Sequence, residues 1–187
     1  MNLDKLANTK NDEFYTPKYA IMPIVSYLEE RGYKTIWSPF DTKESLYVKV
    51  LRQQGYEVIH SHIDEGKNFF DYGGLFGLDI PECDCIVSNP PYSLKTEVLE
   101  HLFQIGKPFA MLVGIAGLFE SKKRFDIFDN NNFEVLYLSP RVSYFQDFQD
   151  FSTVPPSINP PFQSGYVCSE VLPKQICFAR INKKDVA

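Results

Sequence analysis

A short apolar run that is followed at once by two prolines constrains the fold more than any other stretch of the chain. Residues 83–87 (Cys-Asp-Cys-Ile-Val) are typical of a buried strand, and residues 88–93 (Ser-Asn-Pro-Pro-Tyr-Ser) come next. The prolines fix φ and lack an amide N–H, so this backbone can continue neither a helix nor a strand ladder. The sequence therefore predicts a stiff turn at a strand end, which leaves its carbonyls available and fixes the side chains of Asn89 and Tyr92.

This turn resembles the Asn-Pro-Pro-Tyr motif of AdoMet-dependent methyltransferases that act on planar nitrogens, namely adenine or cytosine amines or a glutamine amide. An exocyclic amine is a poor nucleophile because its lone pair is delocalised, and acceptors for both of its protons favour a more nucleophilic geometry. The side-chain oxygen of Asn89 and the carbonyl of Pro90 can supply two such acceptors, and Tyr92 can stack on a flat group. The alternative is a purely structural role, namely an ordinary Pro-Pro turn that ends a strand.

The segment before the first expected helix also carries the resemblance. Thr16 reads as a helix N-cap with Pro17 at the first helical position, and the helix is expected to end at Gly32. That is a sufficient structural account of the segment. In adenine methyltransferases, however, Phe-Tyr-Thr-Pro ahead of a helix lies beside the methionine part of AdoMet, which implies cofactor roles for Tyr15 and Thr16.

A strand expected at residues 35–37 leads into the position of the family's first cofactor motif. Pro39 and Phe40 match the usual Asp-Pro-Phe, but residues 42–45 (Thr-Lys-Glu-Ser) replace its glycine-rich turn, as in small phage-encoded adenine methyltransferases. AdoMet has no phosphate to cradle, so the resemblance implies that Asp41, with Glu44, can hold its ammonium group instead.

Three further residues follow the second expected strand at residues 56–61. Asp64 stands where related folds contact the cofactor ribose hydroxyls, although a solvated loop acid is an equal reading. Asn68 and Phe69 occupy positions that contact the cofactor adenine in the family. The resemblance implies that Asn68 hydrogen-bonds the edge of the adenine and that Phe69 stacks on its face. The resemblance also assigns Asn89 to the cofactor site.

Residues 141–174 form a connection that is unusually long for a compact domain and contains many prolines and aromatic residues. Residues 161–164 (Pro-Phe-Gln-Ser) resemble the family's Pro-Phe-x-Ser segment. The connection is expected either to line a substrate pocket or to act as a lid that covers core. The substrate residues implied are Tyr92, Ser93, Arg141 and Phe162.

The remaining pattern alternates strands with helices. Apolar strands are expected at residues 108–114, 133–138 and 175–181, and helices at 46–54, 98–105 and 118–128. This order predicts an α/β, Rossmann-like sheet that is mostly parallel, with an antiparallel last strand because no helix separates the final two strands. One methyltransferase domain is expected over residues 1–187, with residues 1–12 as a flexible arm.

Composition limits partners and location. The 187 residues carry 19 basic and 24 acidic side chains, a net charge of −5, which argues against an extensive grip on a phosphate backbone and leaves local basic groups such as residues 122–124. Without a long apolar run or a signal-peptide pattern, a cytoplasmic protein and no membrane partner are expected. Cys83 and Cys85 lack a second ligand pair, which favours buried thiols over a metal site.

Together with these features, the family resemblance implies AdoMet-dependent transfer of a methyl group to the exocyclic amine of adenine in DNA, without a metal. With no separate recognition domain, sequence readout would rest on residues 141–174, a partner or a homodimer. The alternatives are methylation of RNA adenine or of a protein glutamine amide, and a degenerate methyltransferase fold that acts as a binding module.

Overall fold

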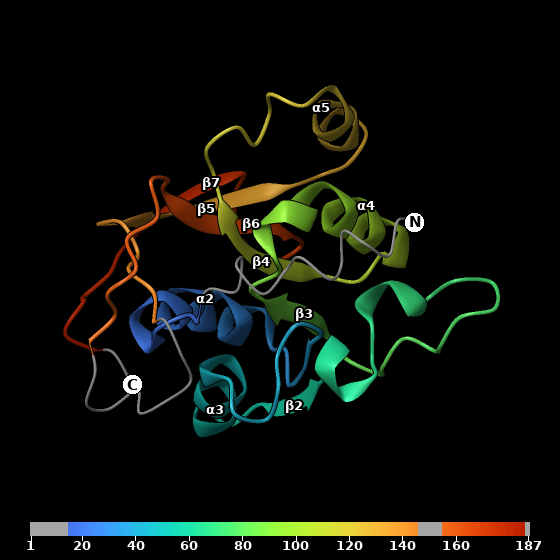
Figure 1. Ribbon diagram of the computed structural model, residues 1–187, viewed down its shortest axis with the longest axis horizontal. Helices are drawn as coiled ribbons and strands as arrows, with labels where there is room; N and C mark the ends of the chain where they lie inside the picture. The colour runs from blue at the N-terminus through green and yellow to red at the C-terminus, as the bar shows by residue number, and fades with distance from the viewer. Residues whose placement is uncertain (1–14, 146–154, 186–187) are drawn as a thin grey trace.

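The computed structural model describes residues 15–145 and 155–185, with a seven-stranded sheet at its centre (Figure 1). The strands are β1 (Thr35–Ser38), β2 (Glu57–His60), β3 (Cys85–Ser88), β4 (Phe109–Gly114), β5 (Glu134–Ser139), β6 (Ser164–Ser169) and β7 (Ile176–Arg180). The helices are α2 (Lys18–Arg31), α3 (Leu46–Gln53), α4 (Lys95–Ile105) and α5 (Lys122–Asp129), with 3-10 turns η2 (Ile63–Glu65), η3 (Phe69–Asp71) and η4 (Tyr92–Leu94). The expected arm at residues 1–12, Phe14 and residues 146–154 of the long connection lie outside the described residues.

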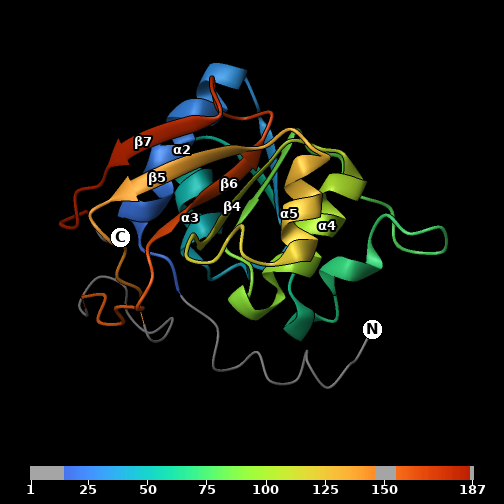
Figure 2. The same ribbon diagram turned by 90° about the horizontal axis from the view of Figure 1, so that it is seen from above.

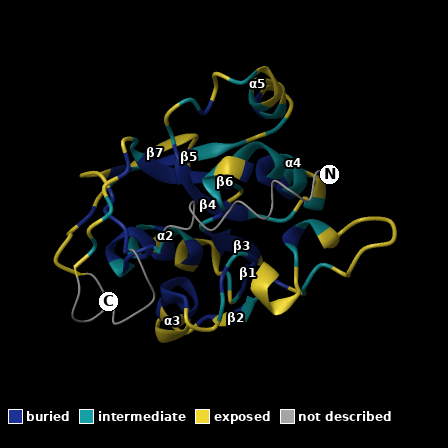
Figure 3. Ribbon diagram, viewed as in Figure 1, coloured by how far each residue is buried: buried dark blue, intermediate teal, exposed yellow. Residues whose placement is uncertain are grey.

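Helices cover both faces of the sheet, as Figures 1 and 2 show. Side chains alternate along each strand, so Ile36 packs with α2 and α3 while its neighbour Trp37 packs with α4. The inner strands β1, β3, β4 and β6 are buried on both faces, which explains their continuous apolar character, whereas the edge strands β2 and β7 are partly exposed (Figure 3). The predicted α/β class with a mostly parallel sheet is confirmed.

The antiparallel strand is β6 and not the last strand. β6 pairs antiparallel with β4 and with β5, whereas β7 runs parallel to β5 at the edge of the sheet. The expected antiparallel last strand is therefore corrected to the strand before it. The inference failed because it treated residues 141–174 as a loop throughout, although β6 occupies part of them.

Three helix starts also differ from expectation, and the first of them is α4, which begins at Lys95, three residues earlier than expected. Pro17, with ψ of 155°, is the N-cap of α2, so the helix begins at Lys18 and the side chain of Thr16 makes no capping hydrogen bond. The helix ends at Gly32, as expected, where φ is 75°. α5 begins four residues later than expected, at Lys122, because Ser121 caps it through a hydrogen bond from the N–H of Arg124.

The sheet order places a topological switch point between β1 and β3. From β1 the chain moves to β2 on one side and then returns to β3 on the other side, with all three strands parallel. In open α/β sheets, ligands bind beyond the carboxyl ends of strands at such a point. A ligand site is therefore expected at the segments that follow β1 and β3.

Candidate functional site

Buried hydroxyl groups join the ends of β1 and β3. Ser38, the last residue of β1, donates from Oγ to the carbonyl of Val87 at 2.9 Å. The carboxylate of Asp41, three residues further on, accepts hydrogen bonds from Ser45 Oγ and Ser88 Oγ. Asp41 is only 7% exposed, and this burial raises the pKa of its carboxyl group to about 6. The loop after β1 is thus fastened directly to the residue that precedes Asn89.

The Asn-Pro-Pro-Tyr turn follows β3 directly and leads into a helix. Pro90 is buried and Asn89 is half-buried. The N–H of Leu94 donates to the carbonyl of Pro91 at 3.0 Å, which closes the turn η4, and α4 begins at the next residue. The expected stiff turn at the end of a buried strand is confirmed.

The long connection meets this turn through two aromatic residues. The hydroxyl of Tyr92 lies 2.8 Å from that of Tyr144, which in turn donates to Ser164 Oγ at 2.7 Å. The ring of Phe162 meets the Tyr92 ring edge-on, with 5.2 Å between centroids. Burial of the hydroxyl groups raises the pKa of Tyr92 well above its usual value and that of Tyr144 to about 12. Both phenols therefore stay protonated and act as hydrogen-bonding groups.

The end of β4 forms the wall behind Phe162. A side chain at Gly114 would place its Cβ 2.9 Å from the Phe162 ring, so only glycine allows this close approach. Lys95, at the start of α4, donates from Nζ to the carbonyl of Gly114 at 2.9 Å. Burial lowers the pKa of this amine, with Arg124 nearby as the next cause.

Sequence reasoning missed Lys95, Gly114 and Tyr144 as neighbours of the turn. Lys95 lies only three residues beyond Tyr92, which was a usable signal. Tyr144 lies 52 residues beyond Tyr92 along the chain, and no local pattern links the two.

A buried polar atom just before α2 has no hydrogen-bond partner within the described part of the chain. Thr16 is 5% exposed, and its Oγ1 has no hydrogen-bond partner among the described residues. The first N–H groups of a helix point away from the helix body and favour an anion. Thr16 and this helix start therefore suit a small carboxylate, as in the methionine part of AdoMet. The start of α2 lies close to α3, because Tyr166 donates to the carbonyl of Ala20 at 2.9 Å and pairs with the hydroxyl of Tyr47 at 2.8 Å.

Aromatic rings cluster beside the loop after β1. Phe69 is 2% exposed and packs against Phe40, Trp37 and His101, with 4.9 Å between the Phe40 and Phe69 centroids. Phe40 is half-buried and keeps part of its surface open. Asn68 caps η3 by accepting from the N–H of Phe70 at 3.2 Å. A stacking ligand at this place would meet Phe40, with Phe69 as the support beneath it.

The other predicted site residues lie at the surface. The side chain of Asp64 is 72% exposed, with its carboxylate 3.6 Å from Nδ1 of His62. Glu44 was expected to hold the ammonium group of the cofactor together with Asp41. In the structure it forms an exposed ion pair with Lys49 at 2.9 Å. Ser93 is exposed. Arg141 is exposed and donates to the carbonyl of Pro160 at 3.2 Å.

Tyr15 and Pro39 complete the predicted cofactor residues. Tyr15 is half-buried and its carbonyl accepts from the N–H of Phe145 at 2.9 Å, which joins the segment before α2 to the long connection. Pro39 is buried directly after β1. The structure thus joins the loop that holds Pro39, Phe40 and Asp41 to the turn through Asp41 and Ser88, and it joins Phe162 to Tyr92, while Asp64 lies exposed on η2.

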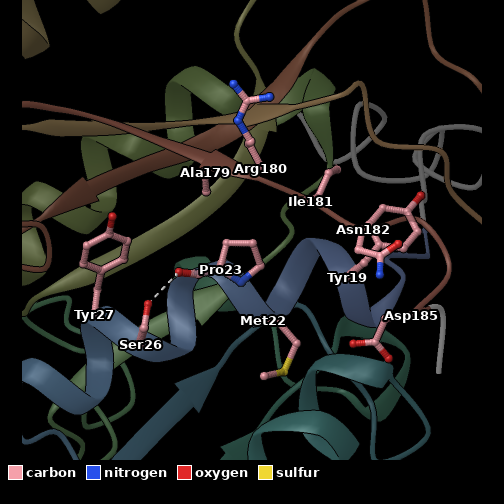
Figure 4. A pocket seen from close by; sticks show the side chains of 10 residues that line it. All are labelled: Tyr19, Met22, Pro23, Ser26, Tyr27, Ala179, Arg180, Ile181, Asn182 and Asp185. Atoms are coloured by element: carbon pink, nitrogen blue, oxygen red, sulfur yellow. Dashed lines mark hydrogen bonds between the residues drawn. The ribbon is translucent and has the colours of Figure 1, made fainter.

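An open pocket of about 340 Å³ lies elsewhere, between α2 and the segment after β7 (Figure 4). It is lined by Tyr19, Met22, Pro23, Ser26, Tyr27, Ala179, Arg180, Ile181, Asn182 and Asp185. None of the predicted site residues lines it. Within the described ranges, no group of three or more His, Cys, Asp or Glu side chains is placed to hold a metal ion, and no helix has both the length and the apolar character to cross a membrane. All four cysteines are buried and free.

No protein-family model matches the sequence, and no curated protein is similar to it in sequence. Among solved structures, the fold is similar to a modification subunit of a putative type I restriction enzyme from Vibrio vulnificus, with a TM-score of 0.46 and 14% sequence identity. The likeness covers 89% of this chain and 46% of that chain.

Proposed function

We propose that this chain is a methyltransferase domain that transfers the methyl group of AdoMet to the exocyclic amine of adenine in DNA. The observation that carries the proposal is the position of Asn89, Pro90 and Tyr92. They form a rigid turn at the carboxyl end of β3, beside the switch point of the sheet, with an aromatic partner for Tyr92 in Phe162.

The turn suits the activation of a planar amine. The Asn89 oxygen and the Pro90 carbonyl accept hydrogen bonds from the two amine N–H groups, and the prolines hold both acceptors without adding competing donors. A flat base rests against Tyr92 and Phe162, with Ser93 and Arg141 at the exposed rim. Because Tyr144 holds the Tyr92 hydroxyl, the ring is oriented before substrate arrives.

Residues on the neighbouring loops would hold the cofactor. Thr16 and the start of α2 suit its carboxylate, Phe40 offers the stacking surface, and Asn68 and Asp64 lie on the segment after β2 that would meet its adenosine. When bound, AdoMet supplies a methyl group on a positively charged sulfur, which an amine can attack directly. No covalent intermediate with a protein side chain is needed, so the catalytic contribution of the chain is positioning and hydrogen bonding.

DNA is the acceptor favoured by the resemblance of residues 14–17 and 39–45 to adenine methyltransferases, because the turn alone fits adenine, cytosine or a glutamine amide. A base in duplex DNA must be flipped out to reach such a turn, at a cost that is lowest for mispaired or single-stranded DNA. We therefore expect more activity on single-stranded than on duplex substrate.

Two measurements test the proposal. AdoMet should give binding heat in calorimetry, and tritiated methyl groups should enter DNA when DNA, RNA and protein fractions are offered separately. Absence of binding heat at millimolar AdoMet would mean that the chain is a degenerate methyltransferase fold that acts as a binding module. Label that enters only RNA or only protein would show that the acceptor is not DNA.

The turn itself is tested by Asn89→Ala. We expect kcat to fall by at least about 100-fold, because an acceptor that preorganises the reacting amine is lost, while AdoMet affinity stays within several-fold. Asn132→Ala, an exposed asparagine before β5, is the matched control. Full turnover by the Asn89 variant would reduce Asn89 to a turn residue.

A further inference from the structure

Asp41 is a buried carboxylate whose hydrogen bonds go to protein groups. Its two oxygens accept from Ser45 Oγ on the same loop and from Ser88 Oγ at the end of β3. Ser88 is 0% exposed and lies 47 residues away along the chain. A carboxylate buried without such donors would be strongly unfavourable, so these contacts account for its presence here.

The position of Ser88 gives this contact a consequence for catalysis. Ser88 is the last residue of β3 and is bonded directly to Asn89, and the two prolines that follow leave little freedom to absorb a shift. A hydrogen bond that holds Ser88 therefore also sets where the Asn89 acceptor lies. Small displacements of a group that positions substrate are costly to rate.

We propose that Asp41 is a positioning residue that fastens the loop after β1 to the Asn-Pro-Pro-Tyr turn and thereby holds Asn89 in place. This role rests on the proposed function of the turn. It is an alternative to the expectation that Asp41 binds the ammonium group of the cofactor, and it is favoured by the 7% exposure of Asp41, which leaves its carboxylate little surface for a ligand.

Three variants separate the two roles. Asp41→Asn keeps a side chain of the same shape that can bond to both serines, but it loses the negative charge. A positioning role predicts kcat and AdoMet affinity within about threefold of the parent protein. A role in binding the ammonium group predicts AdoMet affinity at least tenfold weaker, and that result would overturn the proposal.

Ser88→Ala and Asp41→Ala break the contact from either side. Each should lower kcat at saturating AdoMet by about tenfold or more, with AdoMet affinity within about threefold. The double variant should be no worse than the poorer single variant, because both changes remove one interaction. Multiplicative losses would overturn the proposal. If Asp41→Ala does not fold, Ser88→Ala alone carries the test.

Ser61→Ala is the control, since Ser61 is a buried serine that bonds to the indole of Trp37 at 3.0 Å and not to Asp41 through its side chain. Hydrogen exchange provides a readout that needs no activity. Ser88→Ala should speed amide hydrogen exchange in residues 88–95 relative to Ser61→Ala. Equal exchange rates in the two variants would contradict the positioning role. A parent protein that transfers no methyl group would refute the proposed function and still leave this contact measurable.

Discussion

At the scale of single residues, Asp41 makes stability depend on pH. Burial raises the pKa of its carboxyl group from 3.8 to about 6, so the folded protein holds this proton more tightly than the unfolded chain. The free energy of unfolding contributed by Asp41 therefore falls as pH rises through that window, by roughly 3 kcal/mol. Hydrogen bonds from Ser45 and Ser88 oppose this rise in the Asp41 pKa, and the charge of His62 opposes it less. The nearby phenols of Tyr47 and Tyr166 remain neutral.

Asp41→Asn removes this proton and should make the pH profile flatter. Denaturant unfolding at a series of pH values from about 4 to 7 should show the parent protein losing stability relative to the variant as pH rises. Contributions from groups that do not interact with Asp41 cancel in the difference. A constant difference across the series would contradict a raised pKa at Asp41.

Phe69 and Phe40 should respond differently to truncation. Phe69→Ala leaves a cavity among Trp37, Phe40 and His101, and we expect it to cost about 3–5 kcal/mol of unfolding free energy. Phe40→Ala removes a half-buried ring and should cost less stability, while it weakens AdoMet binding in calorimetry. If Phe69→Ala keeps its stability and loses AdoMet affinity while Phe40→Ala does not, then Phe69 stacks on the cofactor and Phe40 supports it.

At the scale of elements, the connection between β5 and β6 supports the turn through Tyr144. Tyr144→Phe keeps the ring but leaves the buried Tyr92 hydroxyl and Ser164 without that partner. We expect a loss of about 1 kcal/mol in unfolding free energy and a fall in kcat of about tenfold, because the Tyr92 ring is less well oriented.

Tyr56→Phe is the matched control for that change. Its hydroxyl is also buried and donates to the carbonyl of Val25 at 3.3 Å, away from the turn. It should lower stability by a similar amount and leave kcat unchanged. Equal kcat in both variants would mean that Tyr144 serves only the core.

The elements also show where sequence reasoning worked and where it failed. The strand and rigid turn at residues 85–92 were predictable because proline restricts the backbone locally. β6 was not, since Ser164 and Gly165 open it, both of its faces are buried, and no alternation marks it. Its identity as a strand depends on pairing with β4 and β5, which is a property of the assembled sheet.

The same distinction applies to the site. The sequence singled out Asn89 and Tyr92 because their chemistry stands beside prolines in one short stretch. The partners of these residues lie far along the chain, namely Tyr144 for Tyr92 and Asp41 for Ser88, and only the folded sheet brings them together.

At the scale of the whole molecule, one turn stands apart from the core. Residues 73–79 project from the body in both Figures 1 and 2, and the N–H of Gly77 donates to the carbonyl of Gly74 at 3.0 Å. Leu75 and Phe76 lie between these glycines and are 91% and 98% exposed. Apolar side chains this exposed contribute little to folding of a single chain.

A double variant, Leu75→Ser with Phe76→Ser, should therefore leave the free energy of unfolding within about 0.5 kcal/mol of the parent value. Leu102→Ala, on the buried face of α4, should lose about 2–5 kcal/mol in the same denaturant series. Unfolding should be followed at two protein concentrations. If the parent midpoint rises with concentration and that of the serine variant does not, the turn packs against a second copy of the chain. If the parent midpoint is the same at both concentrations, the turn makes no stabilising contact with a second copy, and stability comes from the core around the sheet.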